Sequence, residues 1–163
     1  MVERQTIKGD YLFDVNIYTM FSTYNVRIFN TNMITRNGIS FFLNKCISPP
    51  IVTDGEVVDE DGYIGYIGVG LSTVSPSQDD SKLIDETNIF YNNDVNIDNN
   101  KIILSVETTG DIISGTNEIG VYTTKNLLIS RDVHDTYHLP STSSVKITYT
   151  YTLNQTDYSE TDY

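Results

Sequence analysis

Residues 145–154, Val-Lys-Ile-Thr-Tyr-Thr-Tyr-Thr-Leu-Asn, alternate apolar and polar side chains without a break. Successive side chains of a β-strand point to opposite faces of its sheet, so this period of two predicts a strand with one buried and one wet face. A sheet with one wet face is typically antiparallel. The segment therefore favours an antiparallel β fold.

The composition of the whole chain favours the same class. Its 163 residues contain 20 Thr, 19 Ile and 12 Tyr but no Ala and no Trp. Ala is the best helix former, whereas Thr, Ile and Tyr fit the surface of a pleated sheet. A chain of this length is expected to form one domain. We predict an all-β antiparallel sandwich, jelly-roll-like, in residues 1–154, followed by an acidic, disordered tail in residues 155–163.

The charge of the chain limits its partners. Its 22 acidic and 10 basic residues give a net charge of −12. Such a surface repels phosphate groups, which argues against binding to nucleic acid or to anionic membrane surfaces. No apolar run reaches the length that spans a bilayer, and the first residues lack a signal-peptide pattern. The sequence therefore predicts no nucleic-acid binding, no membrane insertion and synthesis in a cytosol.

One segment in the N-terminal half has a helical period. Between Thr35 and Ile47 the apolar side chains recur three and four positions apart, and two prolines follow. That spacing gives one apolar stripe on a short helix, which proline ends. Thr35 or Asn37 is expected to cap the first turn. The only cysteine, Cys46, lies on this stripe and is expected to be a buried structural thiol.

Most other apolar segments are predicted strands. They are residues 11–17, 26–28, 63–71, 101–107, 118–123 and 126–131, the last two joined by a tight hairpin.

Polar and proline-containing segments connect the predicted strands. Residues 75–78, Ser-Pro-Ser-Gln, resemble a capping box with proline at the first helical position, which predicts a turn or two of helix toward Leu83. Residues 52–62, 92–100 and 132–142 are polar and are predicted to be loops. Because function is often carried by loops on a rigid scaffold, these three segments are the candidate contact surfaces.

Two kinds of segment invite comparison with metal sites. His134 and His138 are four positions apart, but the Leu-Pro pair that follows places them in a loop, and no third ligand has a recognisable spacing. A solvated loop is the expected structure. Residues 59–62 and 94–98 each match only part of a calcium-binding loop. We therefore predict no catalytic residues and no cofactor, with weak structural calcium binding as the alternative.

Tyrosines form the remaining group of candidate functional residues: Tyr63, Tyr66, Tyr91, Tyr122, Tyr149 and Tyr151. Tyrosine is frequent in protein interfaces because one end of its side chain is apolar and the other polar. The pattern leaves two alternatives open. These residues pack in the core and at sheet edges, or they form an exposed aromatic face that binds a glycan.

Four motifs and the terminal Thr-rich strand, residues 144–153, lie in order along residues 30–153 and resemble those of a group of tailed-bacteriophage virion proteins. Residues 30–39 resemble an N-x-x-T-N-x-G opening before a short helix. Residues 67–70, with Pro76, Asp80 and Leu83, resemble a G-x-G … P-x-x-x-D-x-x-L segment. Residues 118–121 resemble E-I-G-L, with Val121 in place of leucine, and residues 127–131 resemble L-L-x-S-R. The acidic segment 52–62 is a departure from the family pattern.

The resemblance implies a structural virion protein that assembles with copies of itself and with tail, baseplate or collar proteins. It implies packing or interface roles for Gly68, Gly70, Pro76, Asp80, Glu118 and Arg131. In particular, Glu118 and Arg131 are expected to form a salt bridge, within one chain or between subunits. The expected localisation is the virion, after synthesis in the host cytoplasm. The alternatives are a capsid decoration or head-fibre protein, and a module that binds a host receptor or surface glycan.

Overall fold

The computed structural model describes residues 2–47, 51–53, 56–58, 62–91 and 94–158, and the side chains of residues 7–42, 62–91 and 95–152. The chain is all-β with antiparallel pairing, as predicted. The strands are β1 Val2–Tyr18, β2 Thr23–Ile34, β3 Ile51–Thr53, β4 Glu56–Val58, β5 Ile64–Gly70, β6 Glu86–Tyr91, β7 Asp94–Asp98, β8 Lys101–Thr109, β9 Glu118–Thr123, β10 Leu128–Val133 and β11 Ser144–Tyr158. The helices are α1 Arg36–Ile47 and α2 Gly110–Ile113.

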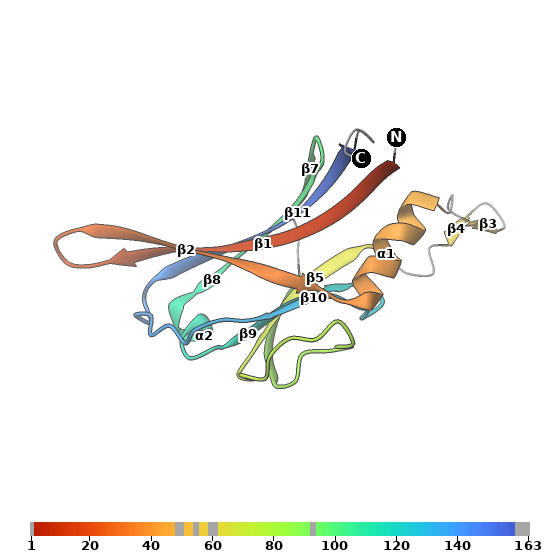
Figure 1. The fold of residues 1–163 in the computed structure, drawn as a ribbon. Helices are drawn as coiled ribbons and strands as arrows, with labels where there is room; N and C mark the ends of the chain where they lie inside the picture. The colour runs from red at the N-terminus through yellow and green to blue at the C-terminus, as the bar shows by residue number, and fades with distance from the viewer. Residues whose placement is uncertain (1, 48–50, 54–55, 59–61, 92–93, 159–163) are drawn as a thin grey trace.

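The described strands form one curled sheet of nine strands, in the order β6-β5-β9-β10-β2-β1-β11-β8-β7, beside a separate pair, β3 and β4 (Figure 1). Strand β2 joins the two halves of the sheet, because its pairing partner changes along its length. Residues 23–32 of β2 pair with β1, whereas Met33 and Ile34 pair with β10 on the other side. One half of the sheet therefore continues from β2 into β1, β11, β8 and β7, and the other into β10, β9, β5 and β6.

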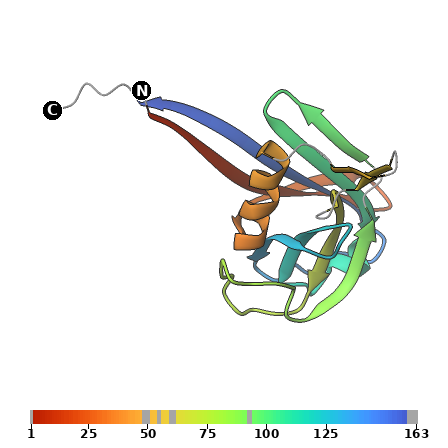
Figure 2. The same ribbon diagram turned by 90° about the vertical axis from the view of Figure 1, so that its right-hand side faces the viewer.

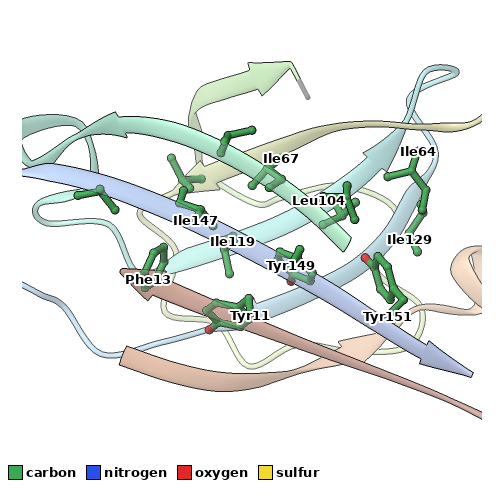
Figure 3. Packing of buried hydrophobic residues seen from close by; sticks show 14 of the residues in the cluster. Tyr11, Phe13, Ile64, Ile67, Leu104, Ile119, Ile129, Ile147, Tyr149 and Tyr151 are labelled. Atoms are coloured by element: carbon green, nitrogen blue, oxygen red, sulfur yellow. The ribbon is translucent and has the colours of Figure 1, made fainter. Parts of the chain in front are cut away.

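The core lies between these two halves of the sheet (Figure 3). Tyr11 and Phe13 of β1, with Ile147 and Tyr149 of β11, come from one half and are fully buried. The other half supplies a matching set of buried side chains: Ile67, Val69, Ile119, Val121 and Ile129. The alternation that predicted β11 is confirmed, because Val145, Ile147, Tyr149 and Tyr151 all face this core.

Helix α1 begins where the sequence predicted, and Thr35 is its cap. The Gly38 N–H donates to Thr35 Oγ1 at 3.0 Å. Thr35 also ties the helix to β10, because its hydroxyl donates to the Leu128 carbonyl at 2.6 Å and its N–H donates to the Ile129 carbonyl at 2.9 Å. The predicted apolar stripe is shifted, since Phe41 and Phe42 are buried while Ile39 is exposed. The side chain of Cys46 lies outside the described residues.

Two predicted boundaries are wrong. Residues 92–100 are not one loop: β7 and β8 form a hairpin whose turn is Asn99–Asn100, with Asn99 at a positive φ of 52°. The tail predicted from residue 155 begins too early, because β11 continues to Tyr158 and pairs with β1 up to Val2. Figure 2 shows this two-stranded ribbon extending away from the rest of the sheet. Polar composition suggested disorder there, but backbone pairing does not require apolar side chains.

Three further segments differ from prediction. Residues 71–85 form an irregular loop rather than a helical turn, and the structural reason is given below. Strand β6 and the single turn α2 were not predicted, because their sequences lack a clear apolar period. Within residues 52–62, β3 and β4 pair over Ile51–Thr53 and Glu56–Val58, and residues 54–55 and 59–61 lie outside the described residues.

Candidate functional site

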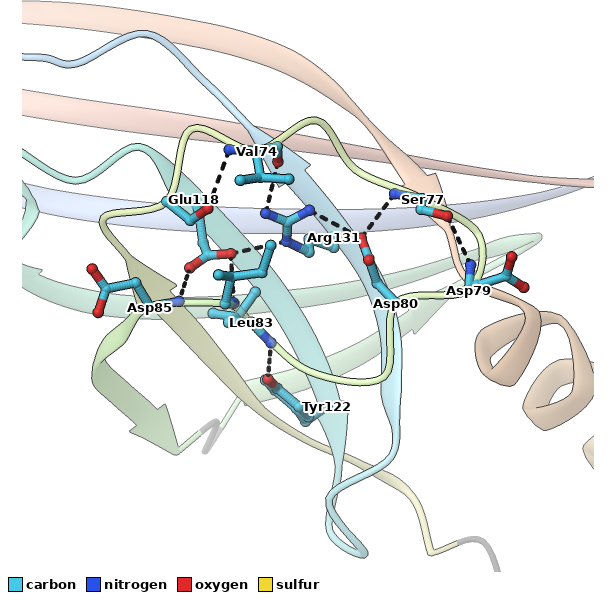
Figure 4. A network of polar contacts seen from close by, with 11 residues as sticks. Val74, Ser77, Asp79, Asp80, Leu83, Asp85, Glu118, Tyr122 and Arg131 are labelled. Atoms are coloured by element: carbon cyan, nitrogen blue, oxygen red, sulfur yellow. Dashed lines mark hydrogen bonds and ion pairs between the residues drawn. The ribbon is translucent and has the colours of Figure 1, made fainter.

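Arg131 occupies the outer face of the sheet and is fully buried by the loop formed by residues 71–85 (Figure 4). A β-bulge in β10 positions it there, since the register with β9 shifts between Leu128 and Ser130. Without this extra residue, Leu128 and Arg131 would point to opposite faces. With it, Ser130 faces the core and Arg131 lies opposite Gly120 of β9 on the outer face.

Three groups accept hydrogen bonds from the Arg131 guanidinium. Nε donates to Glu118 Oε2 at 2.9 Å, Nη1 to Asp80 Oδ2 at 2.9 Å and Nη2 to the Val74 carbonyl at 2.8 Å. Arg131 and Glu118 have no exposed side-chain surface, and Asp80 is only 19% exposed. The predicted Glu118–Arg131 salt bridge is confirmed, and it forms within one chain.

Glu118 also holds the far end of the loop. Its Oε2 accepts the Ile84 N–H at 3.0 Å and its Oε1 accepts the Asp85 N–H at 2.8 Å. The Leu83 N–H donates to the Tyr122 hydroxyl at 2.6 Å. Two side chains of β9, Glu118 and Tyr122, thus accept hydrogen bonds from three successive backbone N–H groups of the loop.

Asp80 organises the middle of the loop, which explains why no helix forms there. Its carboxylate accepts the Ser77 N–H at 2.8 Å, while its own N–H donates to the Ser77 carbonyl at 3.1 Å. These bonds close a turn over residues 77–80 and leave the carboxylate directed at Arg131. Pro76 is half-buried just before this turn. Its predicted place at the first position of a helix is therefore wrong.

Glycines of β5 and β9 allow the loop to lie directly on the sheet. A Cβ at Gly70 would lie 2.3 Å from the Asp85 carbonyl oxygen and 2.6 Å from Glu118 Oε1. A Cβ at Gly68 or Gly120 would lie within 3.0 Å of a Leu83 methyl group. The prediction that these glycines permit tight backbone packing is confirmed for Gly70, whereas Gly68 makes room for the ends of the Glu86 and Leu83 side chains. Gly120 has the same role, and its position in the E-I-G-V segment was the signal that could have identified it.

We call Arg131, Glu118, Asp80 and the loop of residues 71–85 the arginine clamp. Under it lies a small apolar cluster, separate from the main core, made of Tyr66, Leu83, Tyr122 and Leu128. The Tyr66 and Tyr122 rings stack with centroids 4.7 Å apart. Burial raises the pKa of the Tyr122 hydroxyl, so this group stays neutral while its oxygen accepts from the Leu83 N–H. All these charged and polar groups therefore bond to one another within the fold.

A second buried polar group lies at the end of β10. The Tyr11 hydroxyl donates to Asp132 Oδ2 at 2.5 Å, and burial raises the pKa of the Asp132 carboxyl. His134 is also buried, and its ring stacks on Tyr137 with centroids 5.4 Å apart. Its Nδ1–H donates to the Asp135 carbonyl at 2.8 Å, and burial lowers the pKa of the imidazole. The prediction of a solvated loop is therefore wrong for His134 and correct for His138, which is exposed.

The candidate metal ligands do not assemble in the part of the chain that the structure describes. No three His, Cys, Asp or Glu side chains are grouped there so as to hold an ion. Asp94, Asn96 and Asp98 belong to strand β7 and so cannot wrap around a cation as a calcium loop does. Residues 59–61 lie outside the described range. Of the helices in the described range, none is long and apolar enough to cross a bilayer.

The tyrosines divide between the two alternatives that the sequence left open. Tyr66, Tyr122, Tyr149 and Tyr151 are buried. Tyr63 and Tyr91 are 69% and 75% exposed. Tyr91 borders a groove of about 430 Å³ between β6 and β8, which is also lined by Phe90, Val106, Glu107 and Lys146.

Neither a family model, nor a curated protein, nor a solved structure matches the chain.

Proposed function

We propose that the chain is a structural protein of a tailed-bacteriophage virion, which assembles with copies of itself and with tail, baseplate or collar proteins. The observation that carries this proposal is the arginine clamp. Three of the motifs that resemble the phage family supply it: Asp80 and Leu83 come from the G-x-G … P-x-x-x-D-x-x-L motif, Glu118 from residues 118–121 and Arg131 from residues 127–131. Each of these motifs is short and variable in sequence, but the residues of all three bond to one another in the structure.

The arginine clamp supports a role in binding rather than in catalysis. Its guanidinium and its two carboxylates bond to one another and to the loop backbone, and Arg131 and Glu118 have no exposed side-chain surface. A solute cannot reach the Arg131 guanidinium or the Glu118 carboxylate without displacing the loop. Their contribution is to fix the loop and the strands below it as a rigid scaffold. We further propose that the two halves of the curled sheet act as the layers of a jelly-roll-like sandwich.

A projecting arm supplies the binding surface that such a role requires. The turn between β1 and β2 extends beyond the rest of the sheet (Figure 1). At its tip, Met20 and Phe21 are 91% and 93% exposed. Large apolar side chains gathered at the tip of a projecting hairpin are typical of a docking element. The loop of residues 132–142 stays a second candidate contact surface, because Asp135, Thr136, His138 and residues 140–142 are exposed although His134 is buried.

Labelling of particles tests the proposal. Antibodies raised against the purified chain would be applied to phage particles from the culture in which the chain is made. The bound antibody would then be located by immunoelectron microscopy. We expect gold at the tail, baseplate or collar. Label on the head would instead favour a capsid decoration or head-fibre protein. Purified particles that lack the chain by immunoblotting would contradict a virion role.

A receptor- or glycan-binding module is the second candidate, favoured by the exposed Tyr91 ring beside the groove between β6 and β8. Aromatic rings next to polar side chains suit the stacking and hydrogen bonding of a sugar. A glycan array with the wild-type chain and with Tyr91→Ala tests it. Binding that the substitution abolishes would support this module. Signals that are equal for both proteins would contradict a site at Tyr91.

A further inference from the structure

A shallow depression of about 230 Å³ lies on the outer face of the sheet, where β2, β1, β11 and β8 run side by side. It belongs to the outer face because its lining side chains alternate along the strands with the core residues Tyr11, Tyr149 and Tyr151. The side chains of interest are Asp10, Phe29, Lys101, Thr148, Thr150 and Thr152. Four strands therefore contribute to one hollow in the surface.

Strand register places an aromatic ring on one side of the depression and hydroxyl groups on the other. Leu12 of β1 lies between Phe29 of β2 and Thr148 of β11. Asp10, the next outer-face residue of β1, lies opposite Thr150. The three threonines are two positions apart on β11, so their side chains stand roughly 7 Å from one another. The Phe29 ring, which is 64% exposed, thus stands two strands away from a regular row of hydroxyls.

The polar groups of the depression have few partners in the fold. Within the part of the chain that the structure describes, the three threonine hydroxyls and the Lys101 ammonium form no hydrogen bond or ion pair. The Asp10 side chain is 15% exposed, and Lys8 Nζ lies 3.4 Å from its Oδ1. That oxygen is buried without a hydrogen-bond donor among the described residues. A buried acceptor without a donor costs free energy, which a ligand hydroxyl beside this carboxylate would offset.

These groups suit a sugar ring. A carboxylate accepts hydrogen bonds from hydroxyl groups, a lysine ammonium donates to them, and threonine does either. The exposed Phe29 ring offers an apolar surface on which the C–H face of a sugar stacks. A phosphate or carboxylate ligand is disfavoured by Asp10 and by the net charge of −12. A peptide strand is also disfavoured, because β1 and β11 are already paired on both sides at this place.

The depression adjoins the groove between β6 and β8 that Tyr91 borders. Thr148, which lines the depression, lies directly opposite Ser105 of β8, and Ser105 also lines the groove. With about 4.8 Å between neighbouring strands, the surface from Ser105 to Phe29 is roughly 14 Å across. A continuous surface with an exposed aromatic ring toward each end favours a chain of sugars over a single sugar.

We propose that the depression is a binding subsite for one uncharged sugar unit of an oligosaccharide, whose chain continues into the groove at Tyr91. The sugar stacks on Phe29, and its hydroxyls donate to the Asp10 carboxylate. Thr150 and Lys101 bond to the remaining hydroxyls. At about 230 Å³ the depression is smaller than the pockets of about 300–1,000 Å³ that hold drug-sized ligands, as befits a subsite for one unit. The proposal deepens the glycan-binding candidate, on which it rests, and goes beyond the virion role.

A glycan array with matched variants tests the aromatic contact. The array carries neutral and acidic oligosaccharides, from single sugars to longer chains. The wild-type chain is expected to bind neutral oligosaccharides, and to bind longer chains more tightly than single sugars. Phe29→Ala should weaken this binding about tenfold through loss of one stacking contact. Phe21→Ala is the matched control, because Phe21 is 93% exposed at the tip of the arm, and it should leave binding unchanged.

A second variant tests the polar contacts. Thr150→Val keeps the shape of the side chain and removes the hydroxyl, so β11 is left undisturbed. It should weaken binding several-fold. Thr73→Val, in the exposed part of the loop of residues 71–85, is its control and should bind as the wild type does. Equal affinities of the wild type and Phe29→Ala, or a preference for acidic oligosaccharides, would overturn the proposal.

Nuclear magnetic resonance of the labelled wild-type chain locates the ligand without a substitution. Addition of the oligosaccharide that binds most tightly on the array is expected to shift the amide signals of residues 10–12 and 148–152. Shifts confined to residues 89–91 would overturn the subsite and leave the groove as the glycan site.

The array also separates this proposal from the others. Loss of binding with Tyr91→Ala but not with Phe29→Ala would overturn the subsite and support a site in the groove alone. A wild-type chain that binds no neutral oligosaccharide would overturn both the subsite and the glycan-binding candidate. Immunoelectron microscopy of the particles reports on the virion role whatever the array shows.

Discussion

Arg131 and Glu118 form an ion pair in which neither side chain has exposed surface, with Nε and Oε2 2.9 Å apart. Burial of such a pair stabilises a fold only while both members are present, because a single remaining charge is left without compensation. Arg131 also bonds to Asp80 and to the Val74 carbonyl. Loss of Arg131 would therefore release the loop of residues 71–85 as well as leave Glu118 buried and unpaired.

Removal of one member of the pair is expected to be strongly destabilising. Arg131→Met should lower the free energy of unfolding by about 3–5 kcal/mol, the usual cost of an unpaired buried charge. Arg131→Met combined with Glu118→Gln should cost less than the sum of the two single changes, because Glu118 no longer leaves a fully buried, unpaired charge. Urea unfolding of the four proteins in the cycle measures this difference. Strict additivity would contradict coupling between the two residues.

A surface pair with the same spacing provides the control. Arg36 Nε lies 2.9 Å from Asp79 Oδ1, but both side chains are more than 70% exposed. Exposed pairs contribute about 0–1 kcal/mol, because water screens the charges. Arg36→Met should therefore change the free energy of unfolding by about 1 kcal/mol or less. A loss as large as that of Arg131→Met would show that burial does not explain the cost.

The two glycines below the loop should differ in their tolerance of a methyl group. An added Cβ at Gly70 meets the Asp85 backbone carbonyl, which cannot move without displacing the loop. At Gly68 it meets the ends of the Glu86 and Leu83 side chains, which can rotate away. Gly70→Ala should cost about 1–3 kcal/mol of stability, as overpacking does, and Gly68→Ala clearly less. Chemical denaturation of both variants gives the comparison, and the reverse order would contradict the close approach at Gly70.

Thr35 is expected to stabilise the junction between α1 and β10. Thr35→Val keeps the shape of the side chain but removes the acceptor for Gly38 and the donor to Leu128. The loss should be about 1–2 kcal/mol, since capping alone contributes about 1 kcal/mol. Thr73→Val is a suitable control, because Thr73 is exposed in the loop. Thermal unfolding monitored by circular dichroism compares the two, and equal melting temperatures would contradict a capping role.

The strands could be predicted because alternation of apolar and polar side chains is a local signal. The pairing of Glu118 with Arg131 could be predicted from the resemblance of their two segments to the phage motifs. Alternation specified β11, and the apolar stripe after Thr35 specified α1. The loop of residues 71–85 could not be predicted, because Asp80 accepts from Ser77 and Arg131 instead of leaving the turn to propagate as a helix. That choice depends on Arg131, which lies 51 residues further along the chain.

Bulges and chain-end pairing were also invisible in the sequence. The shift between Leu128 and Ser130 inverts the alternation of β10, so a strict period of two would have placed Arg131 in the core. Residues 155–158 have the composition of a tail, yet β1 supplies a partner strand for them. Neither effect has a compositional signal, because each depends on the backbone of a neighbouring strand.

The buried histidine predicts a specific dependence of stability on pH. Burial lowers the pKa of His134 below its ordinary value of 6.5, while Asp132, Asp135 and the bond to the Asp135 carbonyl act in the opposite direction. The unfolded chain therefore binds a proton at this residue more readily than the folded chain does. The stability that neutral His134 contributes is complete above about pH 6.5 and is lost as pH falls through that value toward the lower folded pKa.

Replacement of this ring isolates its contribution. His134→Phe retains an aromatic ring against Tyr137 and Phe13 but cannot take up a proton. The free energy of unfolding of the wild-type chain, minus that of the variant, should fall by up to about 1.4 kcal/mol per pH unit below pH 6.5. Asp132, whose raised pKa acts with the opposite sign, is present in both proteins, so the difference removes its own titration and keeps only its charge interaction with His134. His138→Phe changes an exposed ring and should leave the pH dependence as in the wild type. A difference that is flat between pH 5 and 8 would contradict a neutral, buried His134.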